Sequence, residues 1–251
     1  MKKLPHNIVI KVGTSVLTKD GRFDKVLIGR LAREVSEFLK KGVRVSIVSS
    51  GAIGAGMTLM RQKTRPSSME GLQALAAIGQ RYLMQCWEEA LSRHKYSTAQ
   101  VLLTRDDMVD EKRRLNAKKT LNEIQRLKHV PIINENDTVA TEEIKFGDND
   151  QLSAMLAELI QADLLLILSD TDGLYDGAGQ KLSVVQANDS SIFSHVKDKK
   201  SDFTVGGMRS KLEAIRKCTG AGISVVLTSG TTTNILRRIE KDELFGTRFL
   251  A

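Results

Sequence analysis

The chain has 251 residues, of which 41% are hydrophobic and 27% are charged, and a formal net charge of +8. This composition is typical of a globular protein with a full hydrophobic core. No apolar run approaches the ~20 residues of a membrane-spanning helix, so we expect no membrane partner. The basic balance fits either nucleic acid or small anionic substrates, but only 4% of the residues are aromatic. This scarcity argues against a surface on which bases stack.

The amino terminus and the cysteine content predict a cytoplasmic protein. The apolar segment Ile8–Ile10 is too short for a signal peptide and is followed at once by Lys11. Cys86 and Cys218 each lie in a helical pattern, as reduced structural thiols do. The four histidines are scattered and form no zinc motif. We therefore predict no metal ligands among the side chains.

Short apolar runs alternate with amphipathic segments along the whole chain. The runs predict strands at residues 7–12, 43–48, 99–103, 131–133, 164–168 and 224–227. Apolar residues at helical spacing predict helices over residues 27–39, 72–91, 115–127, 152–160, 208–219 and 235–239. This alternation, without a repeat or a linker, predicts one α/β domain over residues 1–251. Its sheet should be largely parallel, with helices on both faces.

Polar side chains gather where the central predicted strands end. They either follow an apolar run directly or open the helix at 152–160, with Asp148 as its N-cap. They are Asn134, Asp137, Asp148, Asn149, Asp150 and Asp170. Since the carboxyl ends of parallel strands share one edge, where ligands bind in open sheets, we expect these residues to form a substrate floor.

Four loops at the same predicted edge are suited to phosphate. Three of them combine glycines with a hydroxyl, a lysine or a helix start, at residues 11–15, 50–52 and 206–211, and Ser169-Asp170 is the fourth. None is a P-loop, and none has the glycine order of a dinucleotide fingerprint. Each loop alone is more typical of an ordinary turn, so the prediction depends on their shared location.

This combination favours phosphoryl transfer between two anionic substrates, because that reaction needs cations around the moving group and little covalent chemistry by the protein. Lys11 and Lys211 would bracket the phosphates, and Asp150 would hold both ammonium groups. A carboxylate acceptor is already ionised at neutral pH and needs no general base. The absence of a candidate catalytic histidine then fits the chemistry.

Several of these residues also have purely structural interpretations. Asp148 and Ser50 would then be helix N-caps, and Asn134 would only satisfy a turn. Asp150 would make an ordinary first-turn contact with the helix dipole. Lys11 is different, because an unpaired ammonium in a buried strand is costly and requires a partner or a ligand.

Five segments resemble the amino acid kinase family and, within it, the glutamate 5-kinases. They are KVGTSVLT at 11–18, VSSGAI at 48–53, LLTRDDM at 102–108, PIINEND at 131–137 and GDND at 147–150. The resemblance covers residues 8 to about 249. It implies a three-layer αβα sandwich and ATP-dependent phosphorylation of the γ-carboxylate of L-glutamate, the first step of proline biosynthesis, with Mg²⁺. It also implies a homo-oligomer with proline as feedback inhibitor.

The resemblance further implies a role for each matching residue. Catalytic roles fall on Lys11, Lys211 and Asp150. Glutamate binding falls on Ser50, Gly51, Asn134, Asp137, Asp148 and Asn149. Nucleotide binding falls on Lys11, Gly13, Ser169, Asp170, Val205, Gly206, Gly207, Met208, Arg209, Ser210 and Lys211.

The chain departs from the family pattern in three places. Many relatives carry a C-terminal RNA-modification-enzyme-like (PUA) domain, and we expect none here because the sequence stops at Ala251. The usual GTGGM segment is TVGGM at 204–208, with Val205 in place of the threonine, so one hydroxyl near the nucleotide is missing. The loop after Tyr175 is short and lacks the usual Asp-Pro.

Three alternatives remain at this point. A sister kinase acting on N-acetylglutamate, aspartate, carbamate or UMP would share Lys11 and the glycine loops. A dinucleotide oxidoreductase would need another glycine order. An RNA-binding module would bind with an affinity that falls steeply with salt.

Overall fold

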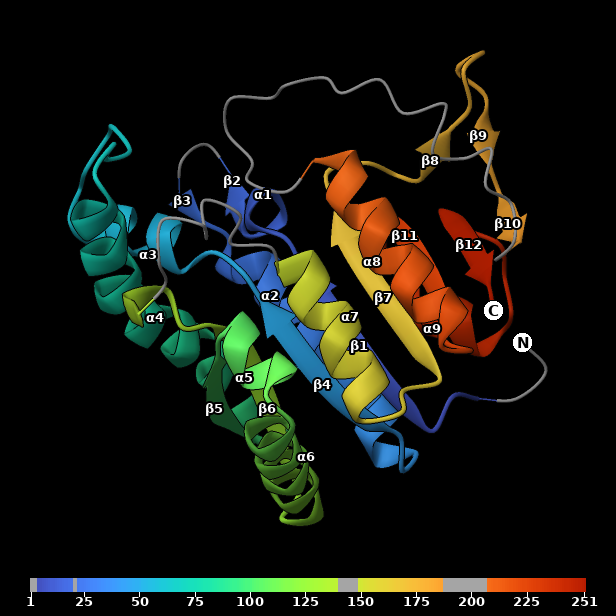
Figure 1. Cartoon of the computed structure of the whole chain (residues 1–251), viewed down its shortest axis with the longest axis horizontal. Helices are drawn as coiled ribbons and strands as arrows, with labels where there is room; N and C mark the ends of the chain where they lie inside the picture. The colour runs from blue at the N-terminus through green and yellow to red at the C-terminus, as the bar shows by residue number, and fades with distance from the viewer. Residues whose placement is uncertain (1–3, 20–21, 140–148, 187–206) are drawn as a thin grey trace.

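The computed structural model describes residues 4–19, 22–139, 149–186 and 207–251. A central sheet has eight strands in the order β10-β12-β11-β7-β1-β4-β6-β5 (Figure 1). Their bounds are β1 Asn7–Val12, β4 Arg44–Ser49, β5 Ser97–Leu103, β6 His129–Glu135, β7 Leu164–Ser169, β10 Val184–Gln186, β11 Ser224–Ser229 and β12 Thr247–Leu250. The six predicted strands are all present: β1 has the predicted bounds, β4 is shifted by one residue, and the other four are longer by one to four residues.

The six strands from β11 to β5 are mutually parallel. The central strands β7, β1, β4 and β6 are buried on both faces, whereas the edge strand β5 is largely half-buried or exposed. β12 pairs antiparallel with β11, and β10 pairs parallel with β12, so these two short strands close one edge in the opposite direction. The sequence pattern missed both, because three or four residues are too few to show a period. Two small hairpins, β2 (Thr18–Lys19) with β3 (Arg22–Phe23) and β8 (Leu174–Tyr175) with β9 (Lys181–Leu182), complete the strands.

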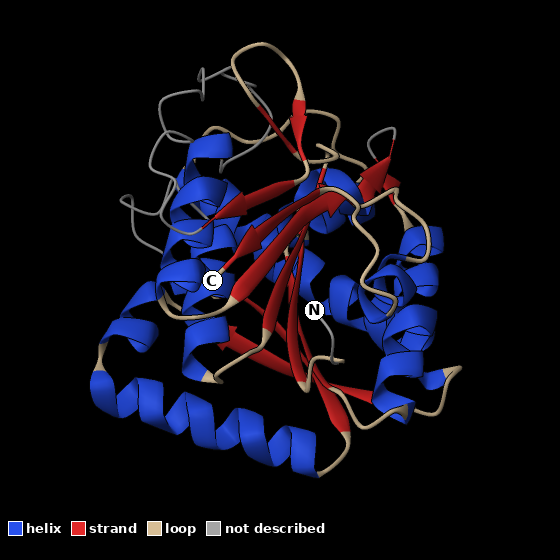
Figure 2. Ribbon diagram, turned by 90° about the vertical axis from the view of Figure 1, so that its right-hand side faces the viewer, coloured by secondary structure: helices blue, strands red, loops and turns tan. Residues whose placement is uncertain are grey.

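Helices cover both faces of the sheet, so the chain forms a three-layer αβα sandwich (Figure 2). The first face carries α2 (Lys25–Lys40), α3 (Ala52–Leu59), α4 (Met69–Ser92) and α9 (Ile235–Glu240). The second face carries α5 (Arg105–Val109), α6 (Glu111–Arg126), α7 (Asn149–Leu159) and α8 (Met208–Gly220). The short α1 (Thr14–Leu17) and the 3₁₀ turn η1 (Asp137–Val139) follow strand ends. The predicted α/β class with a largely parallel sheet is confirmed.

Successive side chains of β1 alternate between the two faces of the sheet and therefore pack against different helix layers. Ile8 and Ile10 point into the core under α2 and α4, whereas Val9 belongs to the core under α7 and α8. Successive side chains of a strand point to opposite faces, so Lys11 shares the face of Val9. The ammonium of Lys11 therefore reaches the amino-terminal ends of α7 and α8.

The strand order reverses next to β1, which determines where a ligand can bind. The chain leaves β1 through α2 to β4 on one side and later places β7 on the other. At such a switch point the loops diverge and leave a crevice at the carboxyl ends of the strands. Of the helices in the described part of the chain, none is long and apolar enough to cross a membrane.

Candidate functional site

An ion-pair triad of Lys11, Asp150 and Lys211 lies at this switch point. Asp150, in the first turn of α7, has Oδ1 2.5 Å from Lys11 Nζ and Oδ2 3.3 Å from Lys211 Nζ. The three side chains come from β1, α7 and α8, and all are buried. The sequence prediction that one carboxylate would lie between these two ammonium groups agrees with this geometry.

The electrostatics of the triad favour an anion. Burial would raise the pKa of Asp150, but the ammonium groups of Lys11 and Lys211 outweigh burial and hold that pKa below its ordinary value. Two ammonium groups share one carboxylate, so the triad carries one excess positive charge. Two ammonium groups at one end of the sheet attract anions, so this geometry favours the binding of a phosphate group.

Gly13 leaves space beside the triad. Its backbone N–H donates to the carbonyl of Leu168 at 3.1 Å, which connects β1 to the end of β7. A Cβ at Gly13 would lie 3.3 Å from that carbonyl oxygen and 3.6 Å from Lys11 Nζ. A side chain here would therefore occupy the volume next to the ammonium group, which glycine leaves for a ligand.

A buried network of amides forms the floor on the other side of Asp150. Asn149 Nδ2 donates to Ser50 Oγ at 2.7 Å and to Asn134 Oδ1 at 2.9 Å. Asn134 Nδ2 in turn donates to Gln80 Oε1 at 2.9 Å. The network joins the ends of β4 and β6 to the first turn of α7 and to the middle of α4. Polar residues that are distant in sequence thus converge on one surface, as the shared edge predicts.

Ser50 is not the N-cap of α3. The cap position belongs to Gly51, which has a left-handed backbone with φ of 100°, and no side chain caps this helix end. The hydroxyl of Ser50 accepts from Asn149 instead. The structural interpretation of Ser50 as a cap is therefore wrong, whereas its placement beside Asn149 agrees with a binding role.

Asp137 lies in the η1 turn beyond β6 and is half-buried. Burial raises its pKa to about 6, and the positive charge of Arg65 opposes this increase only in part. A carboxyl group with a raised pKa gains from a cationic ligand, because the cation favours its ionised form. Asp137 is therefore suited to bind an ammonium group.

The residues expected to bind nucleotide lie at the ends of β7 and α8. Ser169 Oγ donates to Asp170 Oδ1 at 2.8 Å, and the carbonyl of Ser169 accepts from the Gly230 N–H at 2.9 Å. Gly207 caps α8 without a side-chain bond, so the helix begins with backbone N–H groups that suit an anion. Met208 and Ser210 follow in its first turn, and the Ser210 carbonyl accepts from Gln151 Nε2 at 3.3 Å.

Other predicted site residues lie elsewhere or outside the described residues. Arg209 is exposed and pairs with Glu213 at 3.4 Å, on the outer side of α8. Asp148, Val205 and Gly206 lie outside the described residues, so their predicted roles stay predictions.

The sequence interpretation missed Gln80 and Arg65. Gln80 is a polar residue within the apolar stripe of α4, next to Ala76 and Leu83, and that exception is the signal that would have found it. Arg65 lies between α3 and α4 in a segment without a helical or strand period, so only the fold shows its electrostatic effect on Asp137.

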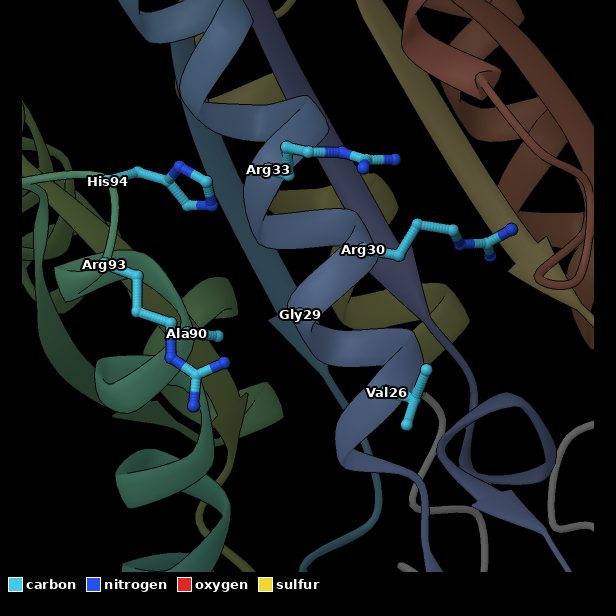
Figure 3. Close-up of a pocket in the computed structure, with 7 residues that line it drawn as sticks. All are labelled: Val26, Gly29, Arg30, Arg33, Ala90, Arg93 and His94. Carbon is cyan, nitrogen blue, oxygen red and sulfur yellow. The ribbon is translucent and has the colours of Figure 1, made fainter.

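A cleft of about 300 Å³ lies between α2 and α4, on the first face of the sheet (Figure 3). Arg93 and His94 extend from the end of α4 toward α2, and Arg33 is exposed on α2. Arg30 instead donates to the backbone carbonyls of the loop after β11, at Gly230, Thr231 and Thr232. The cleft contains none of the predicted site residues, and Lys11 faces the opposite side of the sheet.

Solved structures of known kinases share this fold. UMP kinase from Bacillus anthracis superimposes with a TM-score of 0.65 at 16% identity, covering 99% of this chain and 97% of that structure. Carbamate kinase from Giardia lamblia bound to AMP-PNP gives a TM-score of 0.67 at 15% identity, with 98% of both chains covered. At such low identity, these similarities establish the fold alone.

Proteins with similar sequences identify the family more closely than the fold does. Glutamate 5-kinase from Nitrosomonas eutropha is 42% identical over 98% of this chain and 68% of its own length. Glutamate 5-kinase from Thermoanaerobacter pseudethanolicus is 40% identical over 97% of this chain and 67% of its own length. The chain thus spans about two thirds of the length of these relatives. The model of the amino acid kinase family matches residues 7–229. The resemblance noted in the sequence is confirmed, and the chain belongs to the amino acid kinase family, with glutamate 5-kinases as relatives.

Proposed function

We propose that the chain transfers the γ-phosphoryl group of ATP to the γ-carboxylate of L-glutamate, forming L-glutamyl 5-phosphate for proline biosynthesis. The observation that carries the proposal is the triad, in which Asp150 Oδ1 lies 2.5 Å from Lys11 Nζ and Oδ2 lies 3.3 Å from Lys211 Nζ. The glutamate 5-kinases at about 40% identity support glutamate as the acceptor.

The triad performs the electrostatic part of this reaction. An oxygen of the glutamate carboxylate bonds to the γ-phosphorus while the bond to the β-phosphate oxygen breaks, and ADP leaves with the electron pair. Negative charge spreads over the transferring group in the transition state, where preorganised cations act most strongly. Lys11 and Lys211 are placed to stabilise this charge from two elements. Asp150 holds their positions before the substrates bind.

No residue is needed to remove a proton from the acceptor. A glutamate side chain has a pKa near ~4.3 and is ionised at neutral pH. Its approach to phosphates is unfavourable, because both groups are anionic, and the excess positive charge of the triad offsets this repulsion. The side chains of this protein therefore need only bind the two substrates, align them and stabilise the transferring phosphoryl group.

The amide floor is suited to the amino acid end of glutamate. Asn149, Asn134 and Ser50 are buried and held in one network, so little side-chain entropy is lost when a substrate binds. The half-buried carboxyl of Asp137 lies beyond the same strand, where an α-ammonium group would pair with it. Gly51 brings its backbone to the same edge.

The donor set fits Mg²⁺ that enters with ATP. In the described ranges, no group of three or more His, Cys, Asp or Glu side chains is arranged to hold a metal. Mg²⁺ commonly keeps several waters and binds through substrate phosphates with one or two carboxylates. Asp150 is engaged by two lysines, whereas Asp170 is exposed at the strand end. When bound, Mg²⁺ would neutralise charge on the β- and γ-phosphates.

A coupled assay of ADP release tests the proposal directly. L-glutamate, N-acetylglutamate, L-aspartate, carbamate and UMP are supplied in turn with ATP and Mg²⁺. We expect turnover with L-glutamate to exceed turnover with each other acceptor. Preferred turnover of UMP or carbamate would assign the chain to another branch of the family. Proline inhibition, a homo-oligomer and a cytoplasmic location stay predictions, and the same assay with added proline tests the first of them.

A further inference from the structure

The backbone N–H of Glu135 fixes the direction of each hydrogen bond in the amide network. A backbone N–H only donates, so the Asn134 atom that lies 2.9 Å from it must be Oδ1. The same oxygen accepts from Asn149 Nδ2. Asn134 Nδ2 therefore faces Gln80, which must present Oε1 to it. The amide orientations of Gln80, Asn134 and Asn149 all follow from this single backbone donor.

The ends of the network present one donor and one acceptor. Gln80 Nε2 and Asn149 Oδ1 are both buried, and neither has a hydrogen-bond partner within the part of the chain that the structure describes. Gln80 is 8% exposed and Asn149 is 7% exposed. Buried polar atoms of native proteins are nearly all paired. Two exceptions at opposite ends of one network indicate a ligand that supplies both partners.

An α-amino acid has the required pair of groups. Its ammonium only donates and suits Asn149 Oδ1, whereas its carboxylate only accepts and suits Gln80 Nε2. A phosphate or a simple carboxylate would satisfy the donor and leave the acceptor unpaired. The network therefore distinguishes an amino acid from the other anions that bind to kinases.

The close packing of α3 against α4 brings Gln80 to this floor. Gly79 precedes it, and a Cβ at Gly79 would lie 1.9 Å from the Ala52 carbonyl oxygen and 2.3 Å from the Gly56 nitrogen. A Cβ at Gly56 would lie 2.1 Å from the Leu75 carbonyl oxygen. The two backbones touch because both positions are glycine. Gln80 is thereby held beside the start of α3, which directly follows Ser50 and Gly51.

We propose that Gln80 determines specificity for an α-amino acid: its Oε1 holds Asn134, and its Nε2 donates to the substrate α-carboxylate. This inference rests on the proposed function only for the identity of the amino acid as L-glutamate. Gln80 is assigned no part in moving the phosphoryl group.

Two variants separate these two contacts of Gln80. Gln80→Met removes both in a side chain of similar shape. Gln80→Glu keeps an acceptor for Asn134 and replaces the donor by an anionic oxygen. The matched control is Gln85→Met on the same helix, because Gln85 is exposed and donates to Glu89 at 2.7 Å. The measurements are kcat, the KM values of glutamate and ATP, and the Ki of 4-aminobutanoate, which is glutamate without its α-carboxylate.

Both Gln80 variants should raise the KM of glutamate about 10- to 100-fold, the range for one hydrogen bond to a charged group. The KM of ATP should change less than about twofold, and Gln85→Met should resemble the wild type. The Ki of 4-aminobutanoate should change much less than the KM of glutamate, because this ligand has no α-carboxylate to lose. A purely structural role of Gln80 would weaken both ligands equally.

Equal weakening of both ligands, or an unchanged glutamate KM in Gln80→Glu, would overturn the inference. Gln80→Glu decides the question if Gln80→Met does not fold. A wild-type enzyme that is inactive with glutamate contradicts the proposed function alone. The comparison is then made by calorimetry with the α-amino acid that the wild type binds and its decarboxylated analogue. A wild type that binds no α-amino acid contradicts the inference as well.

Discussion

Lys211 Nζ lies 3.3 Å from Asp150 Oδ2, although the two residues open different helices of the second face. The contact holds α8 against α7 at the edge where β1 ends. Since Lys11 binds the other oxygen of the same carboxylate, the position of each ammonium group depends on Asp150. Substitutions of the lysines and of the aspartate should therefore have different consequences.

Lys211→Ala should fold normally and lose about 10²–10³ in kcat, the range for removing one preorganised electrostatic stabiliser. Lys217→Ala provides the control, because Lys217 lies on the same helix and pairs with Glu158 at 3.7 Å near the surface. Steady-state kinetics and circular dichroism measure the two effects. Near-normal turnover of Lys211→Ala would remove this residue from the mechanism.

Asp150→Asn should lower the free energy of unfolding by about 3–5 kcal/mol at pH 7, because two buried ammonium groups lose their carboxylate. The folded-state pKa of Asp150 is below its ordinary value. Its contribution is therefore present above about pH 4 and is lost as the pH falls through the folded pKa. Urea unfolding should show the difference from wild type shrinking in acid.

Glu158→Gln is the control for that experiment. Glu158 also lies between two cations, Arg114 at 3.6 Å and Lys217 at 3.7 Å, but its side chain is 40% exposed. Exposed ion pairs contribute about 0–1 kcal/mol, so this variant should unfold almost like the wild type. If Asp150→Asn and Glu158→Gln had equal free energies of unfolding at pH 7, burial would not make the ion pairs of Asp150 more stabilising than the exposed pairs of Glu158.

Asp137→Ala should raise the KM of glutamate much more than the KM of ATP, because the carboxyl is expected to pair with the α-ammonium group. The wild-type KM of glutamate should also rise as the pH falls below about 6, where Asp137 takes up a proton. Initial rates between pH 5 and pH 8 measure both effects. Equal changes in the two KM values would exclude Asp137 from the amino acid subsite.

Asp137 should also destabilise the protein without ligand at neutral pH. Its pKa is about 6 in the folded protein and 3.8 ordinarily. As the pH rises, Asp137 therefore loses its proton at a lower pH in the unfolded chain than in the folded protein. The free energy of unfolding falls as the pH rises from about 4 to 6. Asp137→Asn should remove this dependence and be more stable than wild type at pH 7, by up to about 3 kcal/mol. If the free energy of unfolding of the two proteins changed in parallel between pH 4 and pH 7, Asp137 would not have a raised pKa in the folded protein.

Gly79→Ala should destabilise the protein by about 1–3 kcal/mol, because its Cβ would meet the backbone of α3 at 1.9 Å. Gly29→Ala is the matched change on α2, where a Cβ meets no atom within 4 Å. Alanine is the better helix former, so Gly29→Ala should stabilise by about 0.5–1 kcal/mol. Thermal unfolding compares the two. We expect the change in stability to be negative for Gly79→Ala and positive for Gly29→Ala. A Gly79→Ala variant as stable as the wild type would show that α3 and α4 separate easily.

Much of the fold was predictable because its signals are local. The runs at Ile8–Ile10 and Leu164–Leu168 identify buried strands, and the stripes between them identify helices. The prediction that Lys11 and Lys211 would share Asp150 agrees with the structure, because parallel strands bring their carboxyl ends to one edge. The short strands β10 and β12 carry too few residues for a period and were missed.

The amino acid sequence by itself determined the order of the long strands and helices along the chain, the single polar edge and the family of the chain, since each depends on residue types at short spacing. The tertiary structure alone decided that Gln80 reaches Asn134 and that Arg65 acts on Asp137. It also decided that Ser50 binds Asn149 rather than capping a helix. These contacts depend on how closely two helices cross and on which way a side chain turns. Both are properties of packing between distant segments, which no local period records.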